Sequence, residues 1–181
     1  GLCVSNFYCP RTPTVTTVLE SLKEKRTVLI SSPPFTGKSS LCNLIASELS
    51  RQNRSYIYIN LLTYLPGSKK KMKTEKGEEK DVEVYLDDFI QHKTGMTVSE
   101  LFNCGSVLLF DEWQRVYPAT SADVKYSFSC DDDNRAQQIV DSHGLFHLEL
   151  KEAMSRENFN IICFAAYAVN RLESSCSSPV Q

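Results

Sequence analysis

Nine consecutive residues near the N-terminus have the types and spacing needed to bind phosphate. Residues 32–39 match the pattern G-x-x-x-x-G-K-S/T, except that serine replaces the first glycine. With the residue that follows them, the loop consists of Ser32, Pro33, Pro34, Phe35, Thr36, Gly37, Lys38, Ser39 and Ser40. Lys38 offers a mobile ammonium to β- and γ-phosphate oxygens, and Ser39 a hydroxyl to Mg²⁺. The backbone N–H groups from Phe35 through Ser40 would form the anion-binding nest. Both prolines precede these donors, so they stiffen the loop at little cost to the nest.

Two carboxylates follow an apolar run about seventy residues further along. The run Val107-Leu108-Leu109-Phe110 is typical of a buried strand, and Asp111 and Glu112 come directly after it. Asp111 is then expected to face the Mg²⁺ ion opposite Ser39. Glu112 could polarise a water molecule in line with the γ-phosphate. Together with the loop, this pair predicts a site for nucleoside triphosphate and Mg²⁺ in which Lys38 and Glu112 are the catalytic candidates.

Strands and helices alternate along the chain. Short apolar runs predict strands at 27–31, 55–62, 106–111 and 160–166. Helical spacing is predicted after Thr12, with Thr12 as N-cap, after the loop through residue 49, from Asp81 to residue 90, and through residues 146–154. Residues 97–100, "TVSE", predict a capping box. This order predicts a doubly wound, mostly parallel α/β sheet of about four strands with helices on both faces. Ligands bind beyond the C-terminal strand ends of such sheets, where both motifs lie.

Composition limits the classes of function. The chain has 181 residues, a formal charge of −2 and 41% hydrophobic residues, as expected for a single globular domain over 1–181. The charge does not support a broad nucleic-acid-binding surface. No apolar run approaches the roughly 18 residues that span a membrane. No signal peptide is seen and the seven cysteines are scattered, which favours an intracellular protein with free thiols. Residues 68–80 are expected to be a charged, flexible excursion, and 171–181 a frayed tail.

The motifs resemble those of AAA-type ATPases. "SPPFTGKS" is similar to the family's double-proline phosphate loop (Walker A), and "VLLFDE" to its acidic strand (Walker B). The resemblance implies ATP and Mg²⁺ as cofactors. It also implies a polar sensor of the γ-phosphate after the last strand, for which Asn170 is the nearest candidate and Tyr167 the rival. The region from Tyr8 to Arg11 would lie against adenine. The family's usual fifth strand and helical lid are not recognised in this sequence, so slow turnover is expected.

Within that group, "SSPPFTGKSSL", "LLFDEWQRVY" and "FAAYA" look most like the ATPase domain of Crinkler-type proteins of fungi and oomycetes. Members of that family are often effectors delivered to host cells. Serine and phenylalanine here replace two of the family's loop glycines. Three functions remain open: an ATPase, a nucleotide-binding switch or interaction module with negligible turnover, and a P-loop kinase of small molecules. A protein partner or homo-oligomer is also possible, since an exposed sheet edge is expected beside the phosphate-loop strand.

Overall fold

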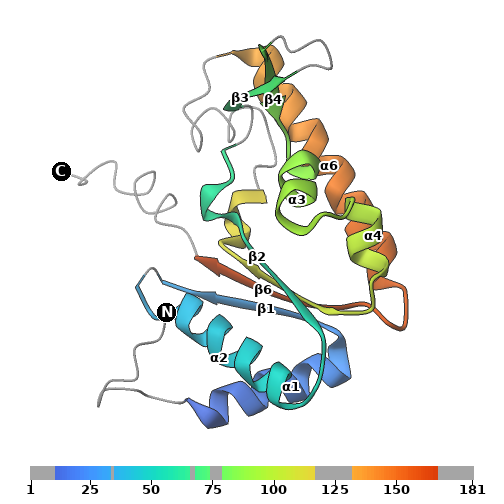
Figure 1. The fold of residues 1–181 in the computed structure, drawn as a ribbon. Helices are drawn as coiled ribbons and strands as arrows, with labels where there is room; N and C mark the ends of the chain where they lie inside the picture. Colours follow the sequence, from blue (N-terminus) through green and yellow to red (C-terminus); the bar gives the residue numbers. More distant parts are fainter. Residues whose placement is uncertain (1–10, 34, 66–67, 74–78, 117–131, 167–181) are drawn as a thin grey trace, which may run out of the picture.

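The computed structural model has four parallel strands at its centre (Figure 1). It describes residues 11–33, 35–65, 68–73, 79–116 and 132–166, with side chains omitted for 68–83. The strands are β1 (Thr27–Ser32), β2 (Tyr56–Asn60), β5 (Val107–Asp111) and β6 (Asn160–Ala166). They lie in the order β1-β6-β5-β2, and each pairing is parallel. The predicted fold class and all four strands are therefore confirmed.

Helices cover both faces of this sheet. Helices α1 (Thr12–Lys25) and α2 (Lys38–Arg51) lie on one face, and α3 (Leu86–Thr94), α4 (Val98–Asn103) and α6 (Asp133–Met154) on the other (Figure 1). Two 3₁₀ turns, η1 (Leu61–Thr63) and η2 (Trp113–Val116), follow β2 and β5. No helix in the described part of the chain is both long and apolar enough to span a bilayer.

Strand β5 divides the hydrophobic core into two layers. Its five residues are all buried, and successive side chains point to opposite faces of the sheet. Val107 and Leu109 pack into the layer under α1 and α2, whereas Leu108 and Phe110 pack under α3, α4 and α6. Burying such a side chain typically contributes about 1.5–3 kcal/mol. The same alternation assigns Asp111 to the α2 side of the sheet, at the carboxyl end of the strand.

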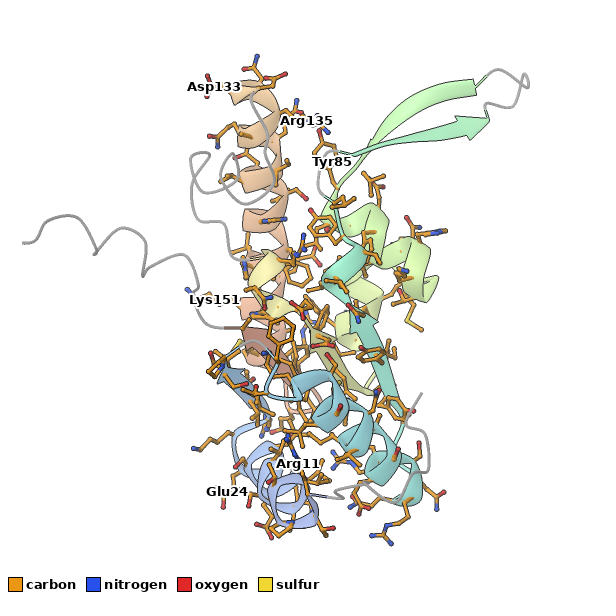
Figure 2. All side chains as sticks on the ribbon, turned by 90° about the vertical axis from the view of Figure 1, so that its left-hand side faces the viewer. Arg11, Glu24, Tyr85, Asp133, Arg135 and Lys151 are labelled. Carbon is orange, nitrogen blue, oxygen red and sulfur yellow. The ribbon has the colours of Figure 1, made fainter. Side chains whose placement is uncertain are left out.

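The charged segment forms secondary structure that the sequence did not predict. Strands β3 (Ser68–Lys73) and β4 (Glu79–Val84) pair antiparallel as a separate two-stranded sheet. Figure 2 shows this hairpin extending away from the helix layers. The helix expected from Asp81 is therefore wrong at its start, because α3 begins only at Leu86. Lysine and glutamate favour helices and are depleted in strands, so the local sequence does not indicate these strands, and the pairing depends on the partner strand across the turn.

Several helix ends also differ from expectation. Arg11, in the left-handed conformation with φ of 44°, is the N-cap of α1, so Thr12 lies inside the helix. Helix α6 begins at Asp133, well before the predicted segment. The Asp132 carboxylate accepts hydrogen bonds from the N–H groups of Asn134 and Arg135, at 2.9 and 3.3 Å, and so caps it. The capping box of Thr97 and Glu100 is confirmed.

Candidate functional site

The loop between β1 and α2 contains hydrogen bonds between its own residues. The Thr36 hydroxyl donates to the carbonyl of Pro33 at 2.8 Å and lies 2.7 Å from the Ser32 hydroxyl. Gly37 is the N-cap of α2, with φ of 81°, and no side chain caps this helix. The first N–H groups of a helix have no partner within it. The start of α2 therefore presents donors and the positive end of the helix dipole, as an anion site requires.

Lys38 extends along the inside of this loop. Only 8% of the residue is exposed. Its ammonium donates to the carbonyls of Ser32 at 3.2 Å and Pro33 at 2.9 Å. An ammonium has three donors, so one remains for an anion while these two keep the group in place. The Lys38 ammonium is therefore held by the loop, at the residue where α2 begins and its backbone N–H groups have no partner within the helix.

Phe35 and Arg11 distinguish this loop, the first by its exposed side chain and the second by its contact with the loop backbone. Phe35 is fully exposed and has φ of 62°, a conformation that normally requires glycine. Arg11 lies against the loop from the start of α1, where Figure 2 labels it. Its Nη2 donates to the carbonyl of Thr36 at 3.2 Å, and it is 3.2 Å from the position a Cβ on Gly37 would take. A side chain larger than hydrogen at Gly37 would therefore press on the guanidinium.

Asp111 ends β5 beside the first turns of α2. It is fully buried, and its Oδ1 accepts the N–H of Glu112 at 3.0 Å. Its Oδ2 accepts the hydroxyl of Tyr58 at 3.2 Å. Burial and then the charge of Asp111 raise the pKa of the Cys42 thiol, one helical turn after Ser39. Burial and then Asp111 also raise the pKa of Tyr58 to about 12. The charge of Asp111 therefore acts on a group of α2 as well as on a group of β2.

Glu112 is held by a residue two positions later. Its backbone is left-handed, with φ of 60°, which is unusual for a glutamate. The Gln114 amide N–H₂ donates to Glu112 Oε2, and Gln114 Oε1 accepts the N–H of Ala166 at 2.9 Å. Ala166 is the last residue of β6. Gln114 therefore ties the Glu112 carboxylate to the end of the neighbouring strand.

Ser39 and Asp111 suit a Mg²⁺ ion that arrives with phosphates. Mg²⁺ is usually bound by one or two carboxylates and completes its shell with water and phosphate oxygens. Asp111 is a buried carboxylate, and no described cationic side chain forms an ion pair with it. Ser39 is exposed in the first turn of α2. The donor set fits the ion that the sequence predicted.

The other predicted site residues divide into two groups. The first group forms the described part of the loop and the start of α2: Ser32, Pro33, Phe35, Thr36, Gly37 and Ser40. Glu112 follows directly after β5, which β6 separates from β1. Pro34, Tyr8, Tyr167 and Asn170 lie outside the described residues. The sequence analysis missed Tyr58 and Gln114. Tyr58 could have been suspected, because Tyr56 and Tyr58 alternate along β2 and so lie on one face of the sheet. No local sequence pattern marks Gln114.

The chain is similar to known proteins in its sequence family and in its fold. Residues 28–174 match the family described as "ATPase family associated with various cellular activities (AAA)". No curated protein matches the chain by sequence. Among solved structures, a DNA replication initiation factor is 16% identical with a TM-score of 0.45, over 93% of this chain and 44% of that one. PCH-2 of C. elegans is 16% identical with a TM-score of 0.43, over 93% and 40%. The chain spans less than half the length of either.

Proposed function

Because the chain belongs to the AAA family of ATPases, for which nucleotide binding and hydrolysis are the general activity, we propose that it binds ATP with Mg²⁺ at the loop between β1 and α2 and hydrolyses the γ-phosphate. One observation carries the proposal. The Lys38 ammonium donates to the loop carbonyls beside an uncapped helix start, and the buried Asp111 ends β5, the strand that packs against the same helix.

Each residue has a defined role in this proposal. The N–H groups at the start of α2 bind the phosphate oxygens, and Lys38 moves its third donor onto the β- and γ-oxygens. Asp111 and Ser39 would hold Mg²⁺, which would neutralise phosphate charge when bound. Glu112 accepts a hydrogen bond from a water molecule and orients it toward the γ-phosphorus. The Gln114 amide donates to Glu112 Oε2, which leaves Oε1 and the second lone pair of Oε2 for the water.

The bond between Gln114 and Glu112 also favours a second candidate. A carboxylate whose orientation is fixed by Gln114 is not free to turn toward a water molecule, so the free chain could act as a nucleotide-binding switch with negligible turnover. The small-molecule kinase is the weaker alternative, because Glu112 beside Asp111 suits water activation. The Crinkler-type likeness is a narrower proposal that rests on three short motifs. A protein partner or second copy is proposed from β1, which pairs only with β6 among the described residues.

Nucleotide binding tests the site directly. ATP affinity is measured by calorimetry for the parent, for Lys38→Ala and for Lys23→Ala, a control on the exposed side of α1. Losing one partner of a buried charge pair typically costs about 2–5 kcal/mol, so Lys38→Ala should bind at least about thirtyfold more weakly. Lys23→Ala should bind as the parent does. Equal affinity in parent and Lys38→Ala would refute the assignment of the loop.

Phosphate release separates the two candidate functions. Under the ATPase proposal, Glu112→Gln keeps ATP affinity but loses turnover, since the amide cannot accept the water proton. Under the switch alternative, the parent binds ATP and releases no phosphate above background. A parent and a Glu112→Gln variant with equal, measurable turnover would remove Glu112 from the mechanism.

A further inference from the structure

The hydroxyl of Tyr58 contacts the acid that is assigned to Mg²⁺. From this geometry we infer that Tyr58 is a positioning residue, which orients the Asp111 carboxylate and thereby sets how strongly Mg²⁺ enhances nucleotide binding. The inference rests on the proposed function and deepens it. It assigns a role to strand β2, which otherwise contributes no residue to the site.

The strand register places the two groups together. Tyr58 pairs with Leu109 and Asn60 with Asp111, so all four residues lie on one face of the sheet, the face that α2 covers. Asp111 is directly opposite Asn60, and Tyr58 lies on the diagonal, a distance that long side chains can span. The Tyr58 hydroxyl reaches Asp111 Oδ2 at 3.2 Å.

The direction of each hydrogen bond follows from the chemistry of the groups. An ionised carboxylate only accepts, so the Tyr58 hydroxyl donates to Asp111. That hydroxyl must then accept the bond from Asn60 Nδ2, at 3.1 Å. Asn60 is oriented in turn, since its Oδ1 accepts the backbone N–H of Leu62 at 2.7 Å at the start of η1. A chain of three bonds with one possible direction thus runs from the backbone after β2 to the acid.

Core packing does not explain this arrangement. Tyr58 is 39% exposed, so its hydroxyl could reach water without Asp111. Tyr56 lies two residues earlier on the same face, is 36% exposed, and has no hydrogen bond from its hydroxyl to any described residue. The two tyrosines share strand, face and exposure, and differ in the contact with the acid. Tyr56 is therefore a matched control for Tyr58.

The contact restricts the orientation of the carboxylate. Oδ1 is held by the N–H of Glu112 and Oδ2 by Tyr58, so rotation of the carboxylate would break at least one bond. Each oxygen keeps a second lone pair for a ligand. Outer residues that orient a metal-binding group typically change metal affinity by about 10–100-fold when removed. At 3.2 Å and partly exposed, Tyr58 is expected at the lower end, about tenfold.

The experiment compares ATP affinity, by calorimetry, in Mg²⁺ and in EDTA for each protein. The ratio of the two affinities measures the metal contribution. Tyr58→Phe should lower this ratio by about tenfold and leave the affinity in EDTA unchanged. Tyr56→Phe should keep the ratio of the parent. Asn60→Ser, which keeps a short acceptor near Leu62 but cannot reach Tyr58, should lower the ratio by less. It carries the test if Tyr58→Phe does not fold, as judged by thermal unfolding.

The outcomes distinguish this inference from the proposed function. A parent that binds ATP in neither buffer refutes both. A parent whose affinity is the same in Mg²⁺ and EDTA refutes the role of Asp111 as a metal ligand, and with it the inference. A parent with a clear metal enhancement that Tyr58→Phe retains in full refutes the inference alone. An equal loss for Tyr56→Phe would assign the effect to the sheet edge and also overturn it.

Discussion

Lowering the pH should destabilise the protein through one buried histidine. His143 on α6 is almost completely buried, and its Nε2 lies 2.9 Å from the hydroxyl of Tyr64. Its Nδ1 has no hydrogen-bond partner among the described residues. Burial, and then the charge of His147, lowers the pKa of His143 from 6.5 to about 4. Protonation would therefore place a positive charge in the core, with an Nδ1–H that has no acceptor among the described residues.

The sign and size follow from linkage. Between the folded pKa of about 4 and the ordinary value of 6.5, the unfolded chain binds more protons than the folded one. The contribution to the free energy of unfolding is thus complete above 6.5 and is lost as pH falls toward 4. The full difference corresponds to about 3 kcal/mol, of which about 2 kcal/mol is lost on going from about pH 7.5 to about pH 5.

Urea unfolding at the two pH values checks this prediction. His143→Gln keeps an acceptor for Tyr64 but cannot titrate, so its loss of stability between the two pH values should be smaller by about 2 kcal/mol. His92→Gln, at an exposed position on α3, should behave as the parent. The pKa of Asp87 is raised by burial and then by the charge of Glu149, which acts in the opposite direction in all three proteins and cancels. Equal pH dependence in parent and His143→Gln would refute the reasoning.

Two further substitutions test the loop and the acid. A non-glycine residue in the left-handed conformation of Phe35 costs about 1–2 kcal/mol, and the added flexibility of glycine in the unfolded chain returns about 0.5–1 kcal/mol. Phe35→Gly should therefore raise the free energy of unfolding by about 0.5–1 kcal/mol in urea, whereas Phe35→Ala should change it little; a destabilised glycine variant would contradict this. Asp111→Asn should abolish most of the Mg²⁺ enhancement of ATP affinity measured by calorimetry, and full enhancement would exclude Asp111 as a ligand.

Local patterns were sufficient for the strands and the phosphate loop. Each strand of the main sheet is a short apolar run, and β5 is buried on both faces because helices cover both sides. The loop could be recognised because its donors are consecutive backbone groups, so sequence proximity is also spatial proximity. Local patterns failed where one residue type has two uses. Helical spacing was predicted only through residues 146–154, yet α6 begins at Asp133 and is capped by Asp132, since a short carboxylate is common both in turns and at N-caps.

The sequence by itself determined the α/β class, the phosphate loop and the acidic strand end, because each depends on neighbours along the chain. Only the folded arrangement of the chain decides which groups far apart in the sequence meet. Tyr58 reaches Asp111 across 53 residues, Gln114 reaches Ala166 across 52, and Tyr64 reaches His143 across 79. These contacts depend on the strand order β1-β6-β5-β2, which places β5 between β2 and β6. The strand order is stabilised by the helices that bury both faces of the sheet. The free energy of that packing depends on contacts between segments, so no single segment of the sequence contains it.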